Sequence, residues 1–86
     1  MDKYELIKTT NPTMFHHIGQ VGVIRFDVAL CYGEDTFINT IGCLVFVPED
    51  GSKPMATSII VSMKEHDGVL EIKTQNSTYT FKKILS

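Results

Sequence analysis

The stretch LEIKTQNSTYTF, residues 70–81, decides the fold class. Apolar and polar residues alternate on both sides of the short polar interruption Gln75-Asn76-Ser77, which is the period of a β-strand with one buried face. The apolar residues that share a side are Leu70, Ile72, Tyr79 and Phe81. The interruption suits the turn of a tight antiparallel hairpin. Asn76 is the residue in it that best tolerates a positive φ. The stretch therefore predicts a hairpin whose alternating apolar side chains enter a core.

Similar strand patterns precede this hairpin along the chain. Runs rich in β-branched and aromatic residues cover 23–30, 37–47 and 57–64, and turn residues separate them about every 8–12 residues. Within 23–30 the expected inner residues are Ile24, Phe26, Val28 and Leu30, and within 57–64 they are Ile59, Val61 and Met63. An open sheet of five such strands would leave two long apolar edges. We therefore expect an all-β fold, a small five- to six-stranded antiparallel barrel that forms one domain over residues 1–86.

The N-terminal segment leaves two alternatives open. Residues 2–7 fit one helical turn capped by Asp2, and they also fit a first strand in which Tyr4 and Leu6 share a side. Asn11 followed by Pro12 is a helix-start signal, so a short helical turn is expected at residues 13–17.

Charge and cysteine content narrow the class of protein. Residues 1–63 carry four cationic and seven anionic side chains, and residues 64–86 carry four and three, so no region has the density that phosphate binding normally needs. No apolar leader precedes the domain and the longest apolar run is far too short for a membrane span. We therefore expect a cytoplasmic protein that contacts no membrane, with Cys31 and Cys43 as free, buried thiols.

Catalytic and metal-binding patterns are missing from the sequence. His16 and His17 are adjacent and would point to opposite sides of an extended chain, so they are expected to be solvated loop residues and not metal ligands. The acidic pairs Glu34-Asp35 and Glu49-Asp50 lie in expected turns, where neither burial nor contrast would create an acid–base pair. We expect no enzyme, no cofactor and no metal.

An excess of apolar residues suggests a binding surface. Leu44, Phe46 and Ile60 fall on the nominally outer sides of their strands. Either the N-terminal segment covers them, or they form a patch for a protein partner or a second copy of the chain. The first functional hypothesis is therefore a non-enzymatic protein-interaction module, a small accessory or inhibitor protein encoded by a phage or mobile element.

The hairpin tip is a second candidate site. Its residues are Thr74, Asn76, Ser77 and Tyr79. Turn chemistry explains them without a ligand, because Asn, Ser and Thr side chains bond nearby backbone groups. The alternative is a polar edge that binds a small ligand or nucleotide.

Two segments carry a resemblance to known proteins. KTTNPTMFHHIGQVGVI, residues 8–24, resembles the entry into KOW-type and Sm-like barrels, where G-x-x-G and a β-branched pair open the second strand, here at Gly19, Gly22 and Val23-Ile24. Residues 56–81 are similar to the closing strands of small bacterial and phage proteins with a T-x-N-S-x-Y hairpin. The resemblance implies a src-homology-3-like barrel. It implies no agreed activity. The alternative functional hypothesis is a nucleic-acid-binding barrel of the KOW or Sm kind, with Lys64, Lys73, Lys82 and Lys83 facing phosphates and Tyr79 or Tyr32 stacking on a base.

Overall fold

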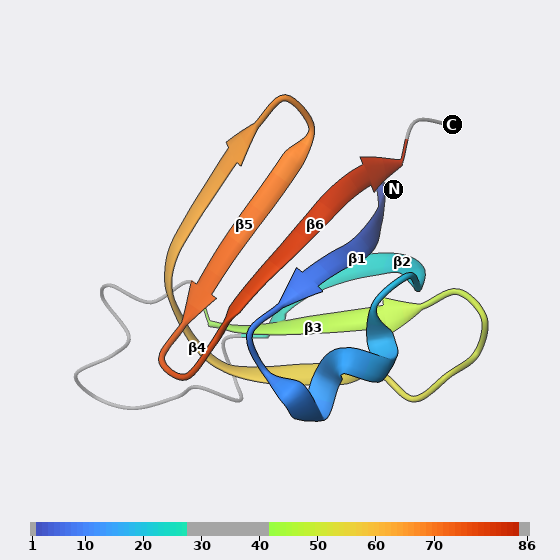
Figure 1. Ribbon diagram of the computed structural model, residues 1–86, viewed down its shortest axis with the longest axis horizontal. Helices are drawn as coiled ribbons and strands as arrows, with labels where there is room; N and C mark the ends of the chain where they lie inside the picture. Colours follow the sequence, from blue (N-terminus) through green and yellow to red (C-terminus); the bar gives the residue numbers. More distant parts are fainter. Residues whose placement is uncertain (1, 28–41, 85–86) are drawn as a thin grey trace.

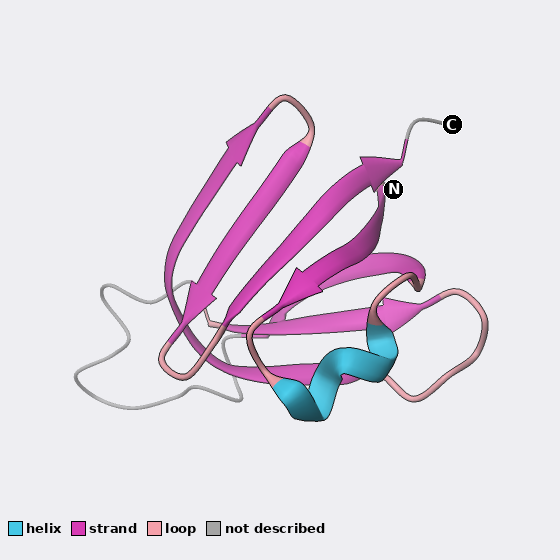
Figure 2. Cartoon of the chain, viewed as in Figure 1, coloured by secondary structure: helices cyan, strands magenta, loops and turns pink. Residues whose placement is uncertain are grey.

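The structure is a computed structural model that describes residues 2–27 and 42–84. In this part of the chain six strands close into an antiparallel barrel in the order β1 to β6, with one short 3-10 helix (Figure 1, Figure 2). The elements are β1 (Lys3–Thr9), η1 (Pro12–His17), β2 (Val21–Asp27), β3 (Cys43–Pro48), β4 (Met55–His66), β5 (Val69–Thr74) and β6 (Thr78–Ile84). The expected small all-β barrel is confirmed. No helix among the described residues has the length and hydropathy needed to cross a bilayer.

The N-terminal segment forms a strand followed by the expected helical turn. β1 pairs with β2 on one side and with β6 on the other, where Leu6 lies opposite Phe81 and closes the barrel. Asn11 caps η1, since its side-chain Oδ1 accepts a hydrogen bond of 3.1 Å from the Thr13 backbone N–H. Pro12 takes an early helical position, where its missing N–H costs nothing.

Strand β4 is long and changes partner along its length. Its first half pairs with β3, where Cys43 lies opposite Ile59, and its second half pairs with β5, where His66 lies opposite Val69. The pairing with β5 contains a bulge between Ile60 and Ser62. Such a bulge bends a strand and increases its local twist, which is how one strand can serve both sides of a small barrel.

The barrel interior is filled by aromatic and aliphatic side chains. Its buried residues are Leu6, Leu44, Phe46, Met55, Ile60, Leu70, Ile72, Tyr79 and Phe81. The Phe46 and Phe81 rings lie 5.2 Å apart between centroids and join β3 to β6 across the core. All four residues predicted from the closing hairpin are therefore core residues.

The predicted faces of two strands are wrong. Leu44 and Phe46 are fully buried and Ile60 is 3% exposed, so these residues point into the barrel and make no outer patch. Strand β3 is apolar on both sides, so alternation alone did not distinguish its two faces. In β4 the bulge shifts the alternation, so Ile60 points inward and Val61 is 56% exposed. Met63 lies opposite the core residue Ile72 and shares its side, as predicted, but it is 40% exposed.

The positive φ angles also differ from expectation. Among the described non-glycine residues, Asp67 has a positive φ, of 51°, and it precedes Gly68 with a φ of 79°. This Asp-Gly pair is the tight hairpin turn between β4 and β5. The prediction of a positive φ at Asn76 is wrong. The turn at residues 75–77 is stabilised instead by the Thr74 hydroxyl, which forms hydrogen bonds with the backbone of Ser77.

Candidate ligand-binding face

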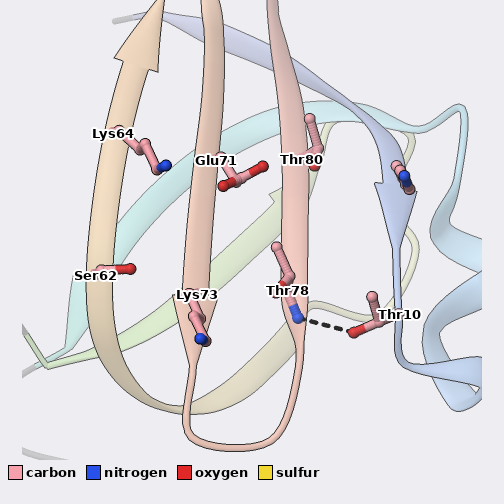
Figure 3. Close-up of a pocket in the computed structure, with 8 residues that line it drawn as sticks. Thr10, Ser62, Lys64, Glu71, Lys73, Thr78 and Thr80 are labelled. Atoms are coloured by element: carbon pink, nitrogen blue, oxygen red, sulfur yellow. Dashed lines mark hydrogen bonds between the residues drawn. The ribbon is translucent and has the colours of Figure 1, made fainter.

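A shallow polar hollow lies on the outer side of the sheet formed by β4, β5, β6 and β1. Its volume is about 460 Å³, and we call its lining the polar face: Lys8, Thr10, Ser62, Lys64, Glu71, Lys73, Thr78 and Thr80. Seven of these side chains come from β4, β5, β6 and β1, and Thr10 directly follows β1 (Figure 3). The four strands are consecutive around the barrel, although β1 lies far from the other three in the sequence. The face is therefore a product of the fold.

Strand register arranges this face in two cross-strand rows. One row runs from Lys64 through Glu71 and Thr80 to Lys8, because each of these residues lies directly opposite the next. The other row runs from Ser62 through Lys73 to Thr78. Thr10 extends the second row, since its hydroxyl accepts a hydrogen bond of 2.9 Å from the Thr78 backbone N–H (Figure 3). Directly opposite residues in a sheet project to the same side, so both rows present their side chains together.

The charge on the polar face is mainly positive. Three lysines surround one carboxylate, that of Glu71, and Lys82 lies two residues beyond Thr80 on the same side of β6. In residues 2–27 and 42–84 none of these four lysines forms an ion pair. Among the described residues these ammonium groups are therefore held in no ion pair, and Glu71 supplies the one carboxylate in the lining of the hollow.

Three of the four lysines predicted to bind phosphates lie on this side of the sheet. These are Lys64, Lys73 and Lys82. Lys83 follows Lys82 in β6 and therefore points to the opposite side of the sheet, where its Nζ lies 3.5 Å from the Asp2 carboxylate. The fourth cation is Lys8, which sequence reasoning missed. Its position depends on the pairing of β1 with β6, which joins the two ends of the chain and has no local sequence signal.

The hairpin tip behaves as a structural turn. Thr74 is buried, its hydroxyl donates to the Ser77 carbonyl at 3.0 Å, and it accepts from the Ser77 N–H at 3.2 Å. Tyr79 is 2% exposed and its hydroxyl accepts a hydrogen bond of 3.3 Å from the Asn11 side chain. Of the four candidate tip residues Asn76 alone is exposed, so the tip presents no built site. Tyr79 is also unable to stack on a base, and Tyr32 lies outside the described residues.

Comparisons with known proteins supply no function for this face. The chain matches no protein-family model, no curated protein and no solved structure. The resemblance to KOW and Sm barrels therefore stays a prediction, and the functional argument depends on the geometry of the chain itself.

The predicted histidine and acidic residues lie in structural positions. His17 is 5% exposed, not solvated, and its Nδ1 lies 2.6 Å from the Gln20 side-chain oxygen. Groups of three or more metal-ligand side chains are absent from the described residues. Glu49 pairs with Lys3 at 2.7 Å. The pKa of Asp50 is held below its ordinary value by hydrogen bonds from the side chain and backbone of Ser52, which marks a turn and not an acid–base pair.

Cys43 is buried as expected but is not a free thiol. It is disulfide-bonded. Disulfides persist in oxidising compartments and are rare in the cytosol. The prediction of a cytoplasmic location rests partly on free thiols at both cysteines, and this disulfide removes that support. Cys31 lies outside the described residues, as do Glu34 and Asp35.

Proposed function

We propose that the protein binds phosphate-bearing polymers, single-stranded nucleic acid in particular, through the polar face. The observation that carries the proposal is the convergence of Lys8, Lys64 and Lys73 on one hollow, where none of them has an ion-pair partner among the described residues. The net charge of the whole chain, −2, does not reveal this local excess. The proposal assigns the protein a binding role and no reaction, so it requires no cofactor.

The spacing of the lysines suits an extended chain of phosphates. Lys64 and Lys73 are diagonal neighbours on adjacent strands, a relation that spans about 7–8 Å. Lys64 and Lys8 end a row across three strand intervals, about 14 Å at the usual spacing. The hydroxyls of Ser62, Thr78 and Thr80 add hydrogen-bond donors between them. The open shape of this set favours a strand laid across the sheet over a small enclosed ligand.

The face has donors for phosphates but no ring for bases. None of its eight residues is aromatic, and base stacking on aromatic side chains is the usual source of affinity beyond charge. We therefore expect binding that depends strongly on salt and little on sequence. The Glu71 carboxylate accepts hydrogen bonds, so it accommodates a ribose 2′-hydroxyl, and we expect RNA to bind better than DNA of the same length.

Fluorescence anisotropy with labelled oligouridylate and oligothymidylate tests the proposal. Probes of about 12 nucleotides cover a typical single-domain site. Three to four phosphate contacts predict a slope of about −2 to −3 in log K against log salt, which is about a 20- to 50-fold loss of affinity between 50 and 200 mM salt. Lys73→Glu is expected to weaken binding at least about tenfold, since it converts a contact into repulsion.

A matched charge change distinguishes the face from the whole molecule. Lys53→Glu alters the net charge equally, but Lys53 is exposed in the link between β3 and β4 and is not part of the polar face. We expect this variant to keep most of the affinity. Absence of binding at low salt, or equal losses from Lys53→Glu and Lys73→Glu, would contradict the proposal.

A second candidate function is the protein-interaction module predicted first from the sequence. The residues proposed for it, Leu44, Phe46 and Ile60, are buried and do not support it. A different observation does, namely the exposed apolar side chains of Val61 and Met63 on β4.

A further inference from the structure

A second hollow adjoins the polar face at the hairpin between β4 and β5. It is open to solvent and has a volume of about 410 Å³, and we call it the hairpin hollow after its lining residues: Lys64, His66, Asp67, Val69 and Glu71. Lys64 and Glu71, which Figure 3 shows on neighbouring strands, also line the polar face, so the two hollows share a wall. The volume lies in the range of sites for small organic groups, about 300–1,000 Å³.

Strand register places the hairpin hollow one row beyond the polar face. His66 lies directly opposite Val69, and Val69 lies directly opposite Lys82. This row is two residues along each strand from the row of Lys64 and Glu71, a distance of about 7 Å at the usual rise per residue. Residues two apart on a strand project to the same side of the sheet. A chain that lies on the polar face can therefore continue into the hairpin hollow without crossing the sheet.

The hairpin hollow contains the two groups that the polar face lacks, a ring and an apolar side chain. The imidazole of His66 is one of the planar side chains on which unpaired bases stack. The His66 side chain is 91% exposed, so most of the ring surface is open to a ligand. Val69 is half-buried and supplies the apolar part of the lining. This combination suits a flat aromatic group.

The turn of the hairpin holds the ring beside this hollow. Asp67 and Gly68 have φ angles of 51° and 79°, as the two central residues of a tight hairpin turn require. The Asp67 carboxylate lies 3.1 Å from the Nε2 atom of His66. An exposed pair of this kind adds little to stability, so its consequence is the orientation of the imidazole. The contact is made at a ring nitrogen, and the faces of the ring stay available for stacking.

We propose, on the basis of the function proposed above, that the hairpin hollow binds a nucleobase of the single strand whose phosphates contact the polar face. A nucleotide whose phosphate contacts Lys64 carries its base on the adjoining sugar, within reach of the row about 7 Å away. There the base stacks on the His66 ring and covers Val69. Every base has a π-face, so this site adds affinity without selecting one base.

Two probes distinguish a base contact from a phosphate contact in fluorescence anisotropy at low salt. One is oligothymidylate of about 12 nucleotides, and the other is an abasic oligomer of the same length, which keeps the phosphates. His66→Ala should weaken binding of oligothymidylate about fivefold or more, the lower end of the contribution of one stacked base. The same variant should bind the abasic oligomer within about twofold of the wild type and keep the salt slope, because it removes no phosphate contact.

Two further variants identify the ring as the cause. His66→Phe keeps a ring and removes the imidazole nitrogens, so it should bind oligothymidylate at least as tightly as the wild type. His16→Ala is the matched control, because His16 is also an exposed histidine but lies on η1, away from both hollows. This variant should bind both probes like the wild type.

The results for Lys73→Glu and His66→Ala separate the base site from the proposed function. If Lys73→Glu weakens binding and His66→Ala does not, the phosphate-binding face is supported and the base site is wrong. Equal losses from His66→Ala with both probes, or a His66→Phe variant as weak as His66→Ala, would show that His66 acts through charge and would overturn the base site. Absence of binding of either probe would contradict both proposals.

Discussion

The two halves of β4 are one strand in two environments. Met55–Ile60 pairs mainly with β3 and contributes two core residues, Met55 and Ile60, both at most 3% exposed. Among the strands that the structure describes, Val61–His66 pairs with β5 alone, and none of its residues is buried. The bulge at Ile60/Ser62 separates the halves. Each half is paired with a strand, yet only the first half contributes core residues. The comparison teaches that burial in β4 depends on whether a segment lies over the core and not on the hydrophobicity of the residue, since Val61 and Met63 are apolar but exposed.

The largest expected effect comes from removing a core ring. Phe46→Ala should lower the free energy of unfolding by about 3–5 kcal/mol, because Phe46 is fully buried against Phe81. Met63→Ala, in the second half of β4, should change it by less than about 0.5 kcal/mol. Urea unfolding followed by circular dichroism measures both. A large loss for Met63→Ala would mean that the two halves share one core.

A steric substitution in the closed part of the barrel should have an intermediate effect. Gly22 lies between β1 and β3, opposite Tyr4 and Pro48. A Cβ placed there would meet the Val47 carbonyl oxygen and lie 2.8 Å from the Pro48 Cα, so backbone must shift. Gly22→Ala should cost about 1–3 kcal/mol of unfolding free energy.

The same urea experiment provides a control for Gly22. Ser62→Ala, in the second half of β4, meets no such crowding and should cost less than about 0.5 kcal/mol. Equal stability of the wild type and Gly22→Ala would show that β2 and β3 do not approach each other so closely at Gly22.

The smallest effects are expected at the link between β5 and β6. Thr74→Val removes the hydroxyl that bonds both the N–H and the carbonyl of Ser77, and should cost about 1–2 kcal/mol. Asn76→Gly, at the exposed tip, should change stability by less than about 0.5 kcal/mol and leave oligonucleotide affinity unchanged. A loss of affinity in Asn76→Gly would restore the tip as a binding site.

The sequence predicted which segments are strands better than it predicted which side chains of each strand point into the core. Alternation placed the closing hairpin and its four core residues correctly, because one side of that hairpin is polar throughout. Alternation failed in β3, where both sides of the strand are apolar. It also failed in β4, where the bulge adds one residue, so that inward and outward positions before the bulge are out of step with those after it. The start of η1 was predictable, because Asn11 and Pro12 act within one turn of the chain.

The polar face was only partly predictable, for a related reason. Lys64, Lys73 and Lys82 belong to consecutive strands, so their meeting followed from the predicted hairpins. Lys8 joins them through a pairing between the first and last strands. No local pattern encodes that register, and the cross-strand rows depend on it.

The pairing of β1 with β6 has a consequence for folding during synthesis on the ribosome. Lys3 lies opposite Ile84, so almost the whole chain must exist before this ladder can form. Contacts of such long sequence separation are slow to form, because a large loop must close before they stabilise anything. While the ribosome is still holding residues near 84, β1 can find β2 but not its second neighbour. The barrel therefore closes only after β6 has emerged from the ribosome, and any truncation that removes β6 leaves the N-terminal strand with an open edge.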